Sequence, residues 1–264
     1  MSRTFALSDI HGQRALWEQI KDYLNPDDTL YFLGDAIDRG PHGFAIMKEL
    51  LTDKRVTYLK GNHEYMMEKA LREEKQGDIL GEEMMLWSYN GCLPTYQEWK
   101  KSGSHYSWIR FIANLPVKVI YNNQKGEEVI LTHAGFTPGR EEPSEYDLVW
   151  SRSHFFTPIT NEKQIVVHGH TPNEYLIEEL KSWEDRQYFQ ERDGAVVYCD
   201  GQKVDIDCGS FYTGHAVLII IVSEFARKSN IFFLICKHSA IFFLAFLQEN
   251  STFWLKRTDN HSIG

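Results

Sequence analysis

The sequence predicts an α/β fold in which helices cover a β-sheet. Short apolar runs, each about one strand long, alternate with segments whose apolar residues recur at helical spacing. Each apolar run ends directly in a polar motif, most of them containing glycine, as expected where a strand stops and turns. With 264 residues, of which 42% are apolar and 25% charged, the chain can bury the core of one large α/β domain.

The alternation is regular over the first 75 residues. The predicted strands cover 4–7, 29–33 and 56–59, and the helical stripes cover 13–24, 44–51 and a segment that begins near Glu64. Strands that alternate with helices in this way form a sheet with helices on its faces. Open α/β sheets place their sites at the carboxyl ends of the strands, where the polar motifs of this chain lie.

The pattern changes in the middle of the chain. Residues 75–115 spread aromatic side chains among glycines and charges, and we predict a helical insertion whose aromatics form a small core of their own. Hairpin signals follow at 117–132 and 195–207, and the apolar run 164–167 predicts one more strand between the two hairpins.

The C-terminal segment differs in composition from the rest. We divide the chain into a main domain at 1–223 and a Phe-rich tail at 224–264, because residues 225–264 hold seven of the 16 phenylalanines. Three interpretations of the tail stay open: buried terminal strands or a helix, a disordered segment, and membrane association. Lys237 and His238 interrupt its apolar sequence, so neither apolar block reaches the length of about 20 residues that spans a bilayer.

Charge and cysteine content narrow the function classes. The formal net charge of -9 argues against a general nucleic-acid binder, whose affinity would come largely from neutralised phosphates. The four cysteines form no CxxC pair, and the N-terminus reaches Asp9 too early for a signal peptide. We therefore expect a cytoplasmic protein with reduced thiols, and neither a nucleic acid nor a membrane as its partner.

Polar motifs follow five of the predicted strands. They are Asp9-Ile10-His11, Gly34-Asp35-Ala36-Ile37-Asp38-Arg39-Gly40, Gly61-Asn62-His63-Glu64, His133, and His168-Gly169-His170. Because all five end strands, we expect their side chains to converge on one edge of one sheet. Imidazole, carboxylate and carboxamide groups without a thiolate suit manganese, iron, zinc or magnesium.

The order and spacing of these motifs resemble the calcineurin-like metallophosphoesterases. More narrowly, they resemble the phosphoprotein phosphatase branch, which includes bacterial and bacteriophage serine/threonine phosphatases. The resemblance spans roughly residues 4–215 and implies a β-sandwich flanked by helices, in four αββα layers, with a two-metal site at the carboxyl ends of strands. The Phe-rich sequence after residue 220 departs from the family.

The resemblance also implies a role for each motif residue. The site would bind two divalent metal ions, with manganese as the first candidate and iron, zinc or magnesium as alternatives. The ligands of the first ion would be Asp9, His11, Asp35 and His170. Those of the second ion would be Asp35, Asn62 and His133. His63 would be the general acid, oriented by Asp38. Arg39, and Arg152 in the looser Trp150-Ser151-Arg152 match, would bind the phosphate oxygens. His168 would not bind metal, and would either support a neighbouring ligand or be simply structural. Apart from the resemblance, we expect Glu64 to open the helix after its motif, where a carboxylate complements the helix dipole.

These roles predict a metal-dependent phosphomonoester hydrolase. The leading hypothesis is a serine/threonine protein phosphatase that acts on a phosphoprotein or phosphopeptide, with a metal-activated water as the nucleophile. The alternative is a diadenosine tetraphosphate (dinucleoside polyphosphate) hydrolase with a nucleotide substrate, because the symmetrical diadenosine tetraphosphatases share this motif set. A phosphodiesterase or nuclease ranks third, and a non-catalytic metal-binding interaction module is the further alternative from another class.

Overall fold

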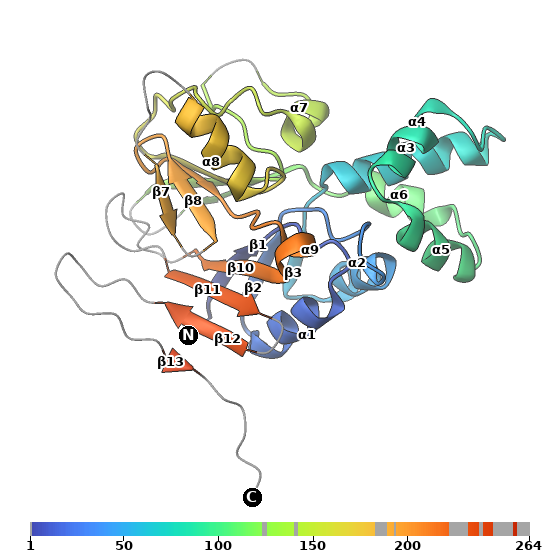
Figure 1. The fold of residues 1–264 in the computed structure, drawn as a ribbon, viewed down its shortest axis with the longest axis horizontal. Helices are drawn as coiled ribbons and strands as arrows, with labels where there is room; N and C mark the ends of the chain where they lie inside the picture. Colours follow the sequence, from blue (N-terminus) through green and yellow to red (C-terminus); the bar gives the residue numbers. More distant parts are fainter. Residues whose placement is uncertain are drawn as a thin grey trace, which may run out of the picture.

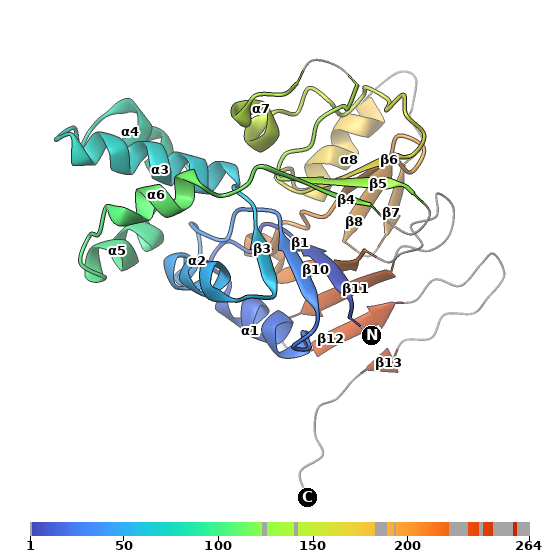
Figure 2. The same ribbon diagram turned by 180° about the vertical axis from the view of Figure 1, so that it is seen from behind.

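The computed structural model describes residues 2–122, 126–139, 142–182, 189–192, 194–221, 232–237, 240–244 and 256–257. Two β-sheets pack face to face, and helices cover the outer face of each (Figure 1, Figure 2). This arrangement confirms the predicted helix-flanked sandwich.

The first sheet has the strand order β13-β12-β11-β10-β1-β2-β3. Its strands are β1 (Thr4–Leu7), β2 (Thr29–Phe32), β3 (Val56–Tyr58), β10 (His215–Ile220), β11 (Phe232–Lys237), β12 (Ala240–Leu244) and β13 (Lys256–Arg257). The parallel part joins β1, β2 and β3, with Phe5 opposite Leu30 and Leu30 opposite Val56. The Phe-rich segment contributes β11, which pairs antiparallel with β10; the division of the chain at residue 223 stays a prediction.

The second sheet has the strand order β4-β5-β6-β9-β8-β7. Its strands are β4 (Lys118–Asn122), β5 (Glu128–Thr132), β6 (Gln164–His168), β7 (Gln190–Arg192), β8 (Ala195–Tyr198) and β9 (Lys203–Asp205). The pairs β4–β5 and β8–β9 are antiparallel hairpins at the predicted positions, and β5, β6 and β9 are parallel. The parallel strands β5 and β6 therefore deliver their last residues to the same end of this sheet.

Helices fall into three groups around the sandwich. Those packed on the first sheet are α1 (Arg14–Tyr23) and α2 (Gly43–Thr52), and those over the second are α7 (Glu145–Trp150) and α8 (Asn173–Ser182). The short α9 (Ser210–Thr213) precedes β10. A third group projects to one side (Figure 1) and contains α3 (Asn62–Lys75), α4 (Glu82–Tyr89), α5 (Leu93–Lys101) and α6 (Ser107–Ala113). The last three lie in the segment for which the sequence predicts a helical insertion.

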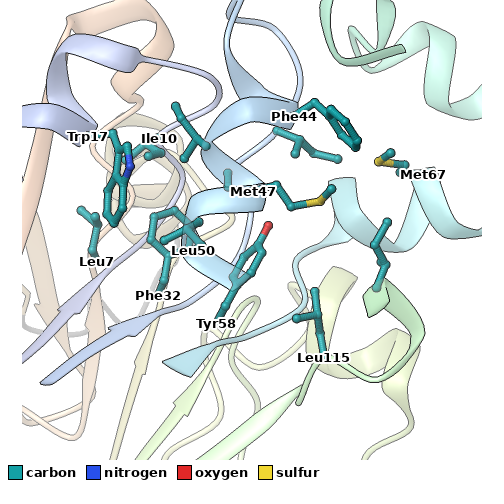
Figure 3. Close-up of a cluster of buried hydrophobic side chains, with 14 of the residues drawn as sticks. Leu7, Ile10, Trp17, Phe32, Phe44, Met47, Leu50, Tyr58, Met67 and Leu115 are labelled. Atoms are coloured by element: carbon teal, nitrogen blue, oxygen red, sulfur yellow. The ribbon is translucent and has the colours of Figure 1, made fainter. Parts of the chain in front are cut away.

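Strand periodicity divides the core into layers. In β1 the side chain of Ala6 faces the second sheet, where it packs with Val129 and Val167, while Phe5 and Leu7 face the helices. Figure 3 shows part of the helix-facing layer, in which Trp17 of α1 and Met47 of α2 lie with Phe32 and Tyr58 of the sheet. The aromatics of the projecting helices join this same layer, so the prediction that they form a separate core is wrong. Buried α3 residues such as Met67 make the layer continuous into the insertion.

The prediction that all five motifs lie on one edge of one sheet is wrong. The motifs containing Asp9, Asp35 and Asn62 follow β1, β2 and β3, whereas His133 and His170 follow β5 and β6 of the second sheet. Strand-end motifs look alike in sequence whichever sheet contains the strand, because sheet membership depends on pairing partners. Among the described residues, none of the helices has the length and hydrophobicity that a bilayer span requires.

Candidate metal centre

The turns that carry the motifs have an unusual backbone conformation. Asp9, His11, Asp35, Asp38 and His170 all have positive φ, between 42° and 70°. Non-glycine residues adopt this left-handed region rarely, and such positions cluster at functional sites, where surrounding structure holds them. Here each turn directs a polar side chain into the space where the two sheets meet.

Two glycines allow these turns to touch. A Cβ on Gly40 would overlap the backbone carbonyl of His11, and a Cβ on Gly61 would overlap the Asp35 carboxylate. The first, second and third motifs therefore meet backbone to backbone, at a distance that only glycine permits.

The carboxylates and imidazoles of the motifs come together in a buried cluster. The Asp35 carboxylate lies at its middle, with Oδ1 at 3.4 Å from His133 Nε2 and Oδ2 at 3.7 Å from His11 Nε2. His11 Nε2 is also 3.9 Å from Asp9 Oδ1. Two groups of potential ligand atoms overlap at Asp35: one contains His11, Asp35 and His63, and the other contains Asp9, Asp35 and His133.

Backbone contacts fix which imidazole nitrogen faces the cluster. His11 Nδ1 donates to the carbonyl of Ile37 at 3.0 Å, and His133 Nδ1 donates to the carbonyl of Leu33 at 2.8 Å. In each ring this leaves Nε2 without a proton and on the side of the cluster, where His133 Nε2 lies 2.9 Å from Asn62 Oδ1. An outer hydrogen bond that sets the tautomer in this way is typical of metal-binding histidines.

Unpartnered polar atoms test whether divalent cations fit this cluster. Among the described residues, Asp9 Oδ1 and His170 Nε2 are buried without a hydrogen-bond partner. Burial, and then the charge of Asp207, raises the pKa of Asp9 well above its ordinary value; burial and the charge of Asp9 do the same for the pKa of Asp35. Bound cations would satisfy the free atoms and offset the repulsion, so the residues fit a divalent metal centre.

The structure groups His170 differently from the sequence prediction. Its Nδ1 lies 3.0 Å from Asn62 Oδ1, and its ring centroid lies 5.1 Å from that of His133. These are neighbours of the second predicted metal position, whereas the prediction assigned His170 to the first. The contact to Asp9 is made instead by the backbone N–H of His170, at 3.0 Å from Oδ2.

A buried acid–base pair lies beside the cluster. His63 Nδ1 is 2.7 Å from Asp38 Oδ2, and the same oxygen accepts a hydrogen bond from Trp87 Nε1 at 2.7 Å. Burial raises the pKa of Asp38 to about 7, while burial and the nearby Arg39 charge lower the pKa of His63. The backbone N–H of His63 also donates to Asp35 Oδ1 at 3.0 Å, which ties the pair to the cluster.

Two arginines border the same space. Arg39 donates from Nη1 to His11 Nε2 at 2.9 Å and from Nη2 to His63 Nε2 at 3.2 Å. Arg152 donates from Nε to the Thr171 hydroxyl at 3.0 Å. Burial lowers the pKa of His133 to about 3, with smaller contributions from the charges of His63, His168 and Arg152. Arg39 thus contacts the cluster directly, and Arg152 is held at the residue that follows His170.

The structure adds residues whose part in the site the sequence did not indicate. Glu64 is fully buried and accepts the backbone N–H groups of Asp35, Ala36 and Gly61 at 2.8 to 3.0 Å, so it braces the second motif as well as capping α3. Its spacing from Gly61 suggested only the cap. Trp87 comes from the insertion, and no motif marked it. His168 lies behind the cluster, with Nε2 at 2.8 Å from the Tyr198 hydroxyl.

Comparison with known proteins identifies the family. The family described as calcineurin-like phosphoesterase matches residues 2–210. The chain belongs to this family of phosphoester hydrolases, which use a dinuclear divalent metal site. The motif-based recognition is thus confirmed, together with its prediction of an enzyme.

Individual relatives match only a part of the chain. A symmetrical bis(5'-nucleosyl)-tetraphosphatase of Burkholderia pseudomallei (strain 668) is 33% identical over 87 residues, and a protein of the same description from Burkholderia mallei (strain SAVP1) matches equally. The match covers 31% of this chain and only 31% of the length of each relative.

Solved structures support the fold. A protein described provisionally as a diadenosine tetraphosphatase has a TM-score of 0.51 at 17% identity, covering 83% of this chain and 89% of its own. A serine/threonine phosphatase from Saccharomyces cerevisiae has a TM-score of 0.50 at 14% identity, covering 84% of this chain and 73% of its own. At these identities the likeness concerns the fold alone.

Proposed function

We propose that this chain is a phosphomonoester hydrolase that acts on phosphoserine and phosphothreonine in proteins. The observation that carries the proposal is the His63–Asp38 pair at 2.7 Å, which lies directly beside the carboxylate–imidazole cluster and beside Arg39. A phosphomonoesterase needs such an acid to protonate the departing alkoxide, in addition to groups that bind the phosphate.

Each residue has a role in this scheme. Two divalent ions, with manganese as the first candidate, would be held by six residues: Asp9, His11, Asp35, Asn62, His133 and His170. When bound, these ions supply a water-derived nucleophile and positive charge at the phosphate. Arg39 and Arg152 bind the phosphate oxygens and orient phosphorus. Once the substrate phosphate has drawn Arg39 away, His63 in its protonated form gives the proton on Nε2 to the leaving oxygen, while Asp38 accepts Nδ1–H and stabilises the charged ring.

The first test uses manganese with p-nitrophenyl phosphate and a phosphoserine peptide. The parent protein should hydrolyse both, and His63→Asn should lose most of its turnover on the phosphoserine peptide while its metal content, measured by mass spectrometry, is unchanged. His42→Asn, at an exposed histidine outside the cluster, is the matched control. Equal activity of His63→Asn and the parent would exclude His63 as the acid; two bound metals without activity would favour a non-catalytic module.

A second candidate is hydrolysis of dinucleoside polyphosphates. The observation that favours it is the match to the Burkholderia proteins described as symmetrical bis(5'-nucleosyl)-tetraphosphatases. A comparison of kcat/KM for a phosphopeptide and for diadenosine tetraphosphate separates the two candidates. A kcat/KM more than about a hundredfold higher for the nucleotide would replace the protein-phosphatase proposal.

A further inference from the structure

One buried ammonium group connects three elements around the metal centre. Lys60, the residue before Gly61, is only 1% exposed. Its Nζ donates to Glu145 Oε1 at 2.6 Å and to Glu68 Oε2 at 3.0 Å, and it lies 3.4 Å from the carbonyl of Ala113. Glu68 belongs to α3, Ala113 ends α6 and Glu145 begins α7, so a single side chain joins all three.

The two carboxylates depend on Lys60 to different degrees. Glu68 also accepts two hydrogen bonds from Arg72, at 2.8 and 3.0 Å, so it would still be paired with the Arg72 guanidinium if Lys60 were replaced. For Glu145, Lys60 is the basic partner among the described contacts. The Lys60–Glu145 pair is therefore the polar connection between α3, which carries His63, and α7.

The other end of α7 leads into the phosphate-binding region. The helix ends at Trp150, whose ring lies edge-on to that of His170 with centroids 5.9 Å apart. Two residues later Arg152 donates to the Thr171 hydroxyl at 3.0 Å. In the middle of the helix, the carbonyl of Leu148 accepts the N–H of Ala134 at 2.8 Å.

These contacts make α7 a short rigid arm. A helix of six residues is about 9 Å long, so movement of its first turn is passed to the residues that follow its last turn. The hydrogen bond between the Leu148 carbonyl and the Ala134 N–H fixes the position of α7. The Lys60–Glu145 ion pair at the first residue of the helix fixes the direction of its axis. A displacement of about 1 Å at a substrate-binding group is enough to impair its contact with the substrate.

We propose that Lys60 and Glu145 are positioning residues of the phosphate site: their ion pair fixes the direction of α7 and thereby holds the Arg152 guanidinium in its place at Thr171, next to His170. This inference rests on the proposed function, because it takes Arg152 as a ligand of the substrate phosphate. It assigns no contact with substrate to Lys60 itself.

The test measures how strongly the manganese-loaded enzyme binds phosphate. Glu145→Gln is the main variant, because the Glu145 side chain is 44% exposed and the substitution keeps its size. We expect KM for p-nitrophenyl phosphate, and the calorimetric dissociation constant for inorganic phosphate, to rise about fivefold, with kcat changed less. The control is Glu142→Gln, three residues before Glu145, which removes the surface ion-pair partner of Lys118. It should change neither KM nor the dissociation constant.

A double-mutant cycle separates positioning from general destabilisation. In an Arg152→Ala background Glu145→Gln should have no further effect on either constant, because the group it positions is gone. Lys60→Met should behave like Glu145→Gln, with its melting temperature recorded beside it. Unchanged phosphate affinity in Glu145→Gln, or the same loss in both backgrounds, overturns the positioning role. A parent that binds phosphate but hydrolyses no phosphomonoester overturns the proposed function instead.

Discussion

At the scale of single residues, the proposed mechanism makes the departure of the leaving group depend on one imidazole. Both nitrogens of His63 are engaged, Nδ1 by Asp38 and Nε2 by Arg39, and the ring is fully buried. A substrate phosphate that draws Arg39 toward its oxygens would free Nε2 to face the ester oxygen. The need for this proton depends on how poor the leaving group is.

That dependence gives a prediction about His63→Asn. A phosphoserine alkoxide requires protonation, whereas p-nitrophenolate departs readily without it. The variant should therefore lose about 10²- to 10⁴-fold in kcat on a phosphoserine peptide and considerably less on p-nitrophenyl phosphate. A series of aryl phosphates measures this as a steeper dependence of log kcat on leaving-group pKa. An unchanged slope would contradict the role of His63 as acid.

At the scale of elements, the projecting helices take part in the site. Trp87 of α4 is fully buried and donates to the Asp38 oxygen that also binds His63. Thr95 of α5 accepts the backbone N–H of Asp38 at 2.8 Å. The insertion thus contributes two hydrogen bonds to Asp38, and under the proposed function its folding would be coupled to catalysis.

We predict that Trp87→Phe lowers kcat by roughly ten- to a hundredfold, because a hydrogen bond to a charged group contributes about 1.5–3 kcal/mol and about 1.4 kcal/mol corresponds to a tenfold change in rate. Steady-state kinetics on one phosphopeptide measures the effect. The matched control is Trp99→Phe, at a tryptophan equally buried in α5 whose Nε1 donates only weakly to the His105 carbonyl, at 3.4 Å. If both variants lower kcat equally, packing of the insertion explains the loss and the hydrogen bond does not.

At the scale of the whole molecule, the centre lies where the two sheets meet. Asp9, Asp35 and Asn62 come from the first sheet, and His133 and His170 from the second. Metal ions bound by both sets would link the sheets and neutralise carboxylates whose pKa values burial has raised. Such ligands stabilise the folded state, because the unfolded chain does not hold the sites.

Chelation should therefore lower the melting temperature. A ligand present at a hundred times its dissociation constant stabilises by about 2.7 kcal/mol, and a chain of this size changes its midpoint by about 2–4 °C per kcal/mol. We expect scanning calorimetry to record a decrease of about 5–10 °C when EDTA is added to the manganese-loaded protein. Asp9→Asn, which weakens metal binding, should show a smaller decrease. An identical midpoint with and without EDTA would contradict this coupling.

Much of the site could be predicted from local sequence. Each motif directly follows its strand, so the positions of Asp35, His63 and His133 depended on short-range patterns and on a resemblance covering most of the chain. Glu64 and Trp87 show where this approach fails. The spacing that places Glu64 at a helix start does not reveal the three N–H groups it accepts, and Trp87 reaches Asp38 from 49 residues away.

The sequence by itself determined the order of strands and helices, the motif residues and the kind of chemistry they support, because these depend on periodicity and on side-chain type. Only the tertiary structure decided that the motifs come from two sheets, that His170 lies with Asn62 and His133, and that Lys60 joins α3 to α7. Those features arise from strand pairing and from contacts between distant segments, for which spacing along the chain carries no signal.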